Sequence, residues 1–145
     1  MIRNLYLLVT IAGQRVAIPA SAVESVVEVD EIAPVPMAPA HVAGLTALRS
    51  RVLTVIDSYA ALGLGRMPDT TVWPMVVVVV QNHLYGLVVD AVDDVAELTG
   101  EAQPIACALG STWGRAASSF MDADGVPLLL LDVVALIAAP VPEAA

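Results

Sequence analysis

The strongest constraint on the fold is that turn-forming residues divide the chain into short β-branched segments. Ten prolines and nine glycines interrupt its 145 residues. Residues 75–80 form a run of Met and five valines that is too short for a helix and too β-branched to prefer one, so we expect a strand buried on both faces. The other expected strands cover residues 5–11, 15–18, 23–29, 42–48, 51–56, 84–89, 92–98, 120–121 and 126–131. Strands of this length and spacing predict an all-β sandwich or small barrels.

The turn signals predict how these strands are connected. Residues 12–14, 49–50 and 82–83 suit short turns, and the Asp-Gly pair within residues 122–125 is typical of a hairpin loop. Residues 31–39 contain three prolines and are expected to form an extended loop, because closely spaced prolines interrupt both helices and sheets.

A strand that ends in Asp and leads into a short helix occurs once in each half of the chain. Asp57 or the adjacent Ser58 can cap a helix that runs to Leu62, and Asp132 can cap a helix over residues 133–138. This repetition favours two related barrels over one large barrel.

The composition excludes several classes of partner. The formal net charge is −9 with only six Lys and Arg residues, which argues against binding to nucleic acid or to an anionic membrane surface. Charged residues make up 14% of the chain, and so thinly charged a surface leaves apolar patches that bind other proteins. The apolar run 126–139 is shorter than the roughly 20 residues that cross a membrane, and residues 1–5 do not resemble a signal peptide. We therefore expect a cytoplasmic protein without direct membrane insertion.

The chain contains few residues that could form an active site or bind a metal ion. His41 and His83 have no ligand-like partner at short spacing, and Cys107 is the only cysteine. Neither a glycine-rich phosphate loop nor a nucleophile elbow is present. We expect a protein that is not an enzyme, with no catalytic residue, no bound metal and no cofactor.

Residues 39–57, which read PAHVAGLTALRSRVLTVID, closely resemble the central signature of CheW-like domains. In that family a proline-containing loop leads to a glycine and an apolar strand that ends in Leu-Arg-Gly. A second strand then ends in Val-Ile-Asp or a similar sequence. Further segments are similar to the family in order and spacing: residues 14–19, 23–27, 84–95 and 129–132. The resemblance spans nearly the whole chain.

This resemblance implies a single domain of two five-stranded SH3-like barrels with short helical turns. We expect the first barrel to cover roughly residues 14–73. The second barrel would then combine residues 1–13 with residues 74–145.

The resemblance also implies a chemotaxis adaptor that couples chemoreceptors to a CheA-type histidine kinase at membrane-associated receptor arrays. One surface would bind the kinase, for which no residue is assigned, and another the cytoplasmic hairpin tip of a chemoreceptor. The receptor-facing residues implied by the resemblance are Arg49, Gly44, Val23, Val26 and Val42. An apolar groove suits a helix, and arginine anchors protein interfaces through directed hydrogen bonds.

Three positions depart from the family pattern. Ser50 replaces a glycine, Thr54 a common proline, and Ser25 a frequent glutamate. If position 50 needs a positive φ, serine there costs about 1 kcal/mol. Because these residues lie near the expected receptor surface, two alternatives stay open. The chain could serve a specialised chemosensory system without motility, or it could be an interaction domain that self-associates.

A third alternative is a small acidic hydrolase or a metal protein. It requires at least two of Asp57, Asp90 and Asp122 to converge.

Overall fold

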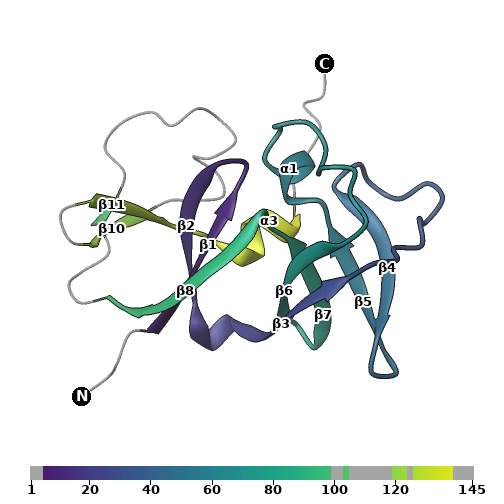
Figure 1. Cartoon of the computed structure of the whole chain (residues 1–145), viewed down its shortest axis with the longest axis horizontal. Coiled ribbons are helices and arrows are strands. Elements are labelled where there is room, and N and C mark those ends of the chain that lie inside the picture. The colour runs from purple at the N-terminus through teal and green to yellow at the C-terminus, as the bar shows by residue number, and fades with distance from the viewer. Residues whose placement is uncertain (1–4, 99–102, 105–118, 124–125, 139–145) are drawn as a thin grey trace.

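The computed structural model describes residues 5–98, 103–104, 119–123 and 126–138, which form two sheets that lie side by side (Figure 1). The six-stranded sheet has the order β8-β1-β2-β11-β10-β9 and the five-stranded sheet the order β3-β6-β7-β5-β4. The first consists of β8 (Ala91–Glu97), β1 (Leu5–Ile11), β2 (Gln14–Pro19), β11 (Val126–Leu130), β10 (Ser119–Ala123) and β9 (Gln103–Pro104). The second consists of β3 (Val23–Val29), β6 (Trp73–Val80), β7 (His83–Val88), β5 (Arg51–Ile56) and β4 (Val42–Leu48).

The helices are short: the 3-10 helix η1 (Ala20–Ala22), α1 (Ser58–Ala61) and α3 (Val133–Ala138). Within the described residues, no helix has the length and apolar character needed to span a membrane. The predicted all-β class, with two sheets and short helical turns, is therefore confirmed.

The predicted caps and the predicted repeat of the two halves are also present. The Asp57 carboxylate accepts a hydrogen bond from the Ala60 N–H, and the Asp132 carboxylate accepts one from the Ala135 N–H, each at 3.1 Å. Each sheet also contains one parallel pair, β5 with β7 and β11 with β2. The two sheets thus have equivalent arrangements of strands.

The division of the chain between the two sheets differs from the predicted barrel boundaries. Strand β2 was expected in the barrel of residues 14–73, but it pairs with β1 in the six-stranded sheet. Strands β6 and β7 were expected in the other barrel, but they lie at the centre of the five-stranded sheet. The physical reason is burial. The valines of β6 are removed from water because β3 and β7 pair with the two edges of this strand and other residues pack on both of its faces.

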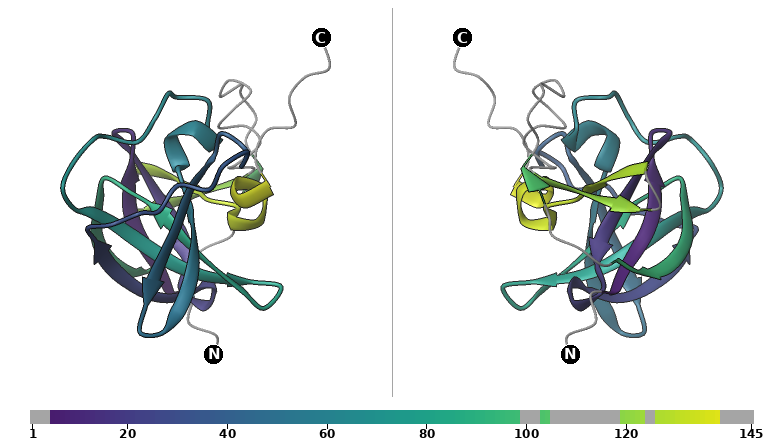
Figure 2. Two further views of the ribbon diagram at one scale, coloured as in Figure 1. Left: turned by 90° about the vertical axis from the view of Figure 1, so that its right-hand side faces the viewer. Right: turned by 90° about the vertical axis from the view of Figure 1, so that its left-hand side faces the viewer.

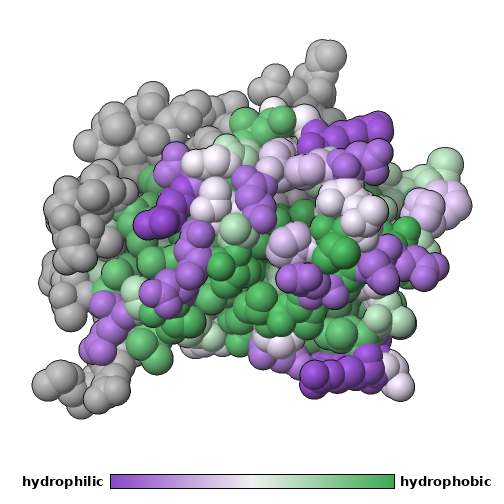
Figure 3. Space-filling model, viewed as in Figure 1, coloured by the Kyte–Doolittle hydropathy of each residue, from purple (hydrophilic) through white to green (hydrophobic). Residues whose placement is uncertain are grey.

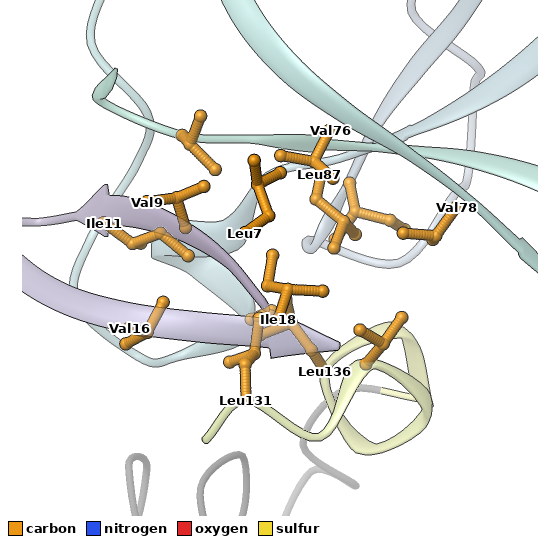
Figure 4. Close-up of a cluster of buried hydrophobic side chains, with 14 of the residues drawn as sticks. Leu7, Val9, Ile11, Val16, Ile18, Val76, Val78, Leu87, Leu131 and Leu136 are labelled. Carbon is orange, nitrogen blue, oxygen red and sulfur yellow. The ribbon is translucent and has the colours of Figure 1, made fainter. Parts of the chain in front are cut away.

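The largest hydrophobic cluster lies between the two sheets (Figure 4). Leu7 and Ile18 of the six-stranded sheet pack with Val76 and Leu87 of the five-stranded sheet, and Leu136 of α3 completes the cluster. Figure 2 shows α3 at one side of both sheets. Two smaller clusters fill the interiors on either side. Strands β2, β6 and β7 each contain three or more consecutive buried residues and are therefore buried on both faces.

One predicted turn was wrong by one residue. The turn between β6 and β7 was expected at residues 82–83, but Val80 pairs with His83, which leaves Gln81 and Asn82 as the turn. Both have positive φ, 51° and 66°, as a type I′ hairpin requires. Asn tolerates this conformation well, whereas His83 is the first residue of β7.

The turn between β4 and β5 predicts a stabilising substitution. Arg49 and Ser50 have φ of 50° and 68° in a two-residue turn closed by the Leu48–Arg51 pair. Because glycine adopts positive φ without steric cost, Ser50→Gly should raise the free energy of unfolding by about 1 kcal/mol. Chemical denaturation monitored by circular dichroism would measure this change.

The matched control is Ser21→Gly in η1, where φ is not positive. There glycine only adds freedom to the unfolded chain, so stability should fall. A Ser50→Gly variant no more stable than the original chain would contradict the strain at this turn.

Candidate functional site

The main candidate site is a cavity of about 220 Å³ at the end of the five-stranded sheet where the β4–β5 turn lies. We call it the Arg49 cavity. Its walls come from β3, from the turn between β4 and β5, and from β5, β6 and β7; the lining residues are Glu24, Ser25, Val26, Val27, Leu48, Arg49, Arg51, Leu53, Val77 and Leu84. Leu53 and Val77 are buried at its base. The cavity therefore combines an apolar interior with a charged rim.

Arg49 lies on the rim because the β4–β5 turn carries it beyond the ends of both strands. The turn projects from the lower edge of the five-stranded sheet in Figure 1. Arg49 is exposed, and it forms no ion pair within the described residues. Its guanidinium is therefore available to a partner.

Arg51 differs from Arg49 because it is already paired. Its Nη1 donates to Glu24 Oε1 at 2.5 Å, which joins β5 to β3 across the mouth of the cavity. The pair is partly exposed, so it contributes only modestly to stability. Its main effect is to neutralise one of the two arginines on the rim.

The structure brings together only two of the five residues predicted to face a receptor. Val26 and Arg49 both line the Arg49 cavity, and Val26 is 45% exposed. Val23 and Val42 instead pack against the core between the sheets. Gly44 is buried in β4, where a Cβ atom would lie 2.2 Å from the carbonyl oxygen of Ala33. Gly44 thus allows the loop after β3 to approach β4 and does not line the cavity.

The sequence did not predict that Glu24 and Arg51 would lie on the rim beside Arg49. Glu24 and Arg51 lie on strands that are not adjacent in the sheet order, so no regular spacing in the sequence links them. Leu53, Val77 and Leu84 appeared only as members of strands. Ser25 was singled out as a departure from the family pattern, and it does line the cavity.

Asp57 and Asp90, considered as acids of an active site, serve as structural hydrogen-bond acceptors. The buried Asp57 carboxylate accepts from the N–H of Ala60 and, through both oxygens, from that of Met67. The Asp90 carboxylate accepts from the Gly13 N–H and from the Tyr59 hydroxyl. The Asp122 side chain and Cys107 lie outside the described part of the chain. In that part, no group of three or more His, Cys, Asp or Glu residues could hold a metal ion.

The two histidines have different surroundings. His41 lies just before β4, and its Nε2 donates to the Ile137 carbonyl in α3 at 2.9 Å. This bond ties the entry of β4 to the helix that packs between the sheets. His83 is an exposed residue at the start of β7. Among the described residues, neither histidine belongs to a group of His, Cys, Asp or Glu side chains that could hold a metal ion.

Two β-sheets around a shared core define a double-barrel β module, with a cavity at one end of the five-stranded sheet. The model of the CheW-like domain matches residues 5–141. The chain therefore belongs to the CheW-like domain family, which is a family of chemotaxis scaffolding proteins.

Comparison with known proteins supports this assignment both in sequence and in fold. The chain is 40% identical over 62 residues to "Chemotaxis protein CheW" of Rhizobium meliloti and 38% identical over 66 residues to "Probable chemotaxis protein CheW" of Rhizobium etli. These matches cover 43% and 46% of this chain but only 40% and 43% of the relatives. The fold is that of the scaffolding protein TtCheW from Thermoanaerobacter tengcongensis, with a TM-score of 0.79 and 19% identity over 91% of this chain and 90% of that one. This similarity confirms the two SH3-like barrels.

Proposed function

We propose that this chain is an adaptor that couples chemoreceptors to a CheA-type histidine kinase. It would act without enzymatic activity, in the cytoplasm, at membrane-associated receptor arrays. The observation that carries the proposal is the free Arg49 guanidinium beside an apolar cavity on a CheW-like fold. Coupling requires two partners to be bound at once, and we assign the receptor tip to the Arg49 cavity.

The physical properties of the cavity suit the tip of a helical hairpin. An apolar base excludes water from a contact, and a charged group at the rim then fixes the orientation of the partner. Arginine is effective in this position because its planar guanidinium forms several directed hydrogen bonds. In a chain of net charge −9, a free arginine at such a site favours an acidic partner.

Arg49→Ala should weaken binding to the receptor tip by about tenfold or more, because a central arginine of an interface typically contributes 1.4 kcal/mol or more. The measurement is co-purification, followed by titration, with the receptor tip and the kinase regulatory domain from the same organism. Kinase binding should change little.

The matched control is Arg66→Ala. Arg66 is also exposed, but it lines a different cleft together with Asp57 and Ala60. Helix α1 and the β4–β5 turn lie at opposite ends of the five-stranded sheet (Figure 1). Equal losses of receptor binding from the two substitutions would contradict the role of Arg49. A wild-type chain that binds neither partner would contradict the adaptor function itself.

Self-association is a second candidate function, and the exposed apolar surface favours it. Figure 3 shows apolar residues gathered across the middle of one face. Val95 is 55% exposed on β8, the terminal strand of its sheet, and Val134 is 60% exposed on α3. Size-exclusion chromatography with light scattering distinguishes the candidates. Concentration-dependent oligomers without kinase or receptor binding would favour self-association.

A further inference from the structure

Met37 is the most exposed large apolar side chain of the described residues, at 101%. The other methionines of that part of the chain are protected from solvent to different degrees. Met75 and Met121 are buried, and Met67 is half-buried and packs against the cluster that contains Met75. Met37 is therefore the one among these four whose thioether is fully open to solvent.

Met37 lies at the tip of a tight turn in the loop between β3 and β4. The Ala38 N–H donates to the Val35 carbonyl at 3.3 Å. Met37 has a φ of 67°, and the preceding proline fixes its own φ at about −65°, so the two residues form a type II turn. Glycine is the residue that this position favours, because a side chain meets a steric cost at positive φ. Methionine here bears that cost and buries nothing in return.

The surface around Met37 is apolar and is separate from the Arg49 cavity. Residues 32–40 contain no ionisable side chain. Val35 is exposed in the same turn, and the exposed Leu45 of β4 pairs with Ala33 of the loop. None of the residues that line the Arg49 cavity belongs to this loop. The polarity of this surface therefore depends strongly on the chemical state of the Met37 sulfur.

We propose that Met37 is a site of reversible oxidation by hydroperoxides, at which the surface of this loop changes from apolar to polar while the fold is kept. The thioether sulfur attacks one peroxide oxygen, the O–O bond breaks, and methionine sulfoxide forms together with water or an alcohol. The sulfur loses two electrons and the peroxide gains them. A methionine sulfoxide reductase restores the thioether with two electrons from thiols and releases the oxygen as water.

The burial of each methionine explains why oxidation of Met37 spares the fold. The Met37 side chain is already in water, so a sulfoxide there removes no packing and buries no polar group. Met75 and Met121 belong to hydrophobic clusters, where a sulfoxide would place an unpaired polar oxygen in the core. Their burial also keeps peroxide away from the sulfur. The site is independent of the adaptor function, because its chemistry needs neither receptor nor kinase.

Treatment of the folded chain with dilute hydrogen peroxide, followed by digestion and mass spectrometry, tests the site. The Met37 peptide should gain one oxygen before the Met67 peptide. It should also do so at least about tenfold faster than the peptides of Met75 and Met121, since susceptibility follows exposure. The melting temperature should stay the same when Met37 alone is oxidised. A methionine sulfoxide reductase should then remove the oxygen from the folded chain.

Two variants separate the reactivity of the sulfur from the polarity of the surface. Met37→Leu keeps an apolar side chain of similar size without the sulfur, so the first uptake of oxygen should disappear. Met37→Gln makes the position polar without any oxidant. On a hydrophobic interaction column, Met37→Gln and the oxidised chain should both elute earlier than the original chain, and Met37→Leu should elute with it. Thermal melting verifies that both variants fold.

Four results would overturn the inference. They are oxidation of a buried methionine as fast as Met37, a lower melting temperature after oxidation of Met37 alone, unchanged elution of the oxidised chain, and a sulfoxide that the reductase does not reduce. None of these results bears on the adaptor function, because none of the measurements involves a receptor or a kinase.

Discussion

Gly44→Ala is expected to lower the free energy of unfolding by about 3 kcal/mol, because two separate costs coincide at this residue. A Cβ atom would lie 2.2 Å from the Ala33 carbonyl oxygen and 2.8 Å from its carbon. The φ of Gly44 is +152°, in a region that side chains rarely adopt. The neighbouring backbone cannot easily retreat, because Ala33 and Leu45 exchange two hydrogen bonds of 2.8 Å.

Gly65→Ala separates the two costs. Gly65 also has a positive φ, +106°, but a Cβ atom there meets nothing within 4 Å. It should lose about 1 kcal/mol through backbone strain alone. Chemical denaturation of both variants gives the difference, and equal losses would show that the contact with Ala33 is unimportant. A large loss at Gly44 would also mean that reduced receptor binding by its variants reports on folding.

Asp57→Ala should cost about 3 kcal/mol of stability, the second large effect that we expect. The carboxylate is 6% exposed. It caps α1 through the Ala60 N–H and holds the following loop through the Met67 N–H at 3.0 and 3.1 Å. Removal leaves these N–H groups without an acceptor inside the protein, and hydrogen bonds to a charged group are stronger than neutral ones. Thermal and chemical denaturation measure the loss.

Two further variants provide losses of stability with which that of Asp57→Ala can be compared. Asp57→Asn retains one oxygen acceptor and should lose less than Asp57→Ala. Asp132→Ala removes the equivalent cap of α3, but Asp132 is exposed and its carboxylate accepts one hydrogen bond from the described residues, so about 1 kcal/mol is expected. Equal losses at Asp57 and Asp132 would contradict the role of Asp57 in fixing the loop. Receptor binding by folded Asp57→Asn should remain close to that of the original chain.

The strands could be predicted from the sequence because they are determined locally. Strands β1, β3, β4 and β5 have the predicted bounds, since β-branched residues and turn residues alternate clearly there. The Asp caps were equally visible, because a cap involves residues only three positions apart. The turn at Gln81 and Asn82 was misplaced by one residue, because several neighbouring polar residues can form such a turn.

The candidate site was predictable only in part, because it depends on which face each strand buries. Val23, Val26 and Val42 look alike in the sequence, yet Val26 lines the cavity while the other two pack against the core. Gly44 was predicted to face a receptor, but it is buried in β4 and allows the close approach of the Ala33 backbone. The ion pair of Glu24 with Arg51 had no signal at all in the sequence.

The sequence by itself therefore determined the all-β class, the approximate positions of most strands and both helix caps, because these follow from propensities and contacts between near neighbours. Only the tertiary structure decided how the strands divide between the two sheets, since pairing depends on burying both faces of β6 and of the β1–β2 hairpin. It also decided that Arg51 is paired within the described chain while Arg49 is free. That difference arises because β3 lies opposite β5 across the Arg49 cavity. Tertiary packing thus brings together residues that no local sequence pattern connects.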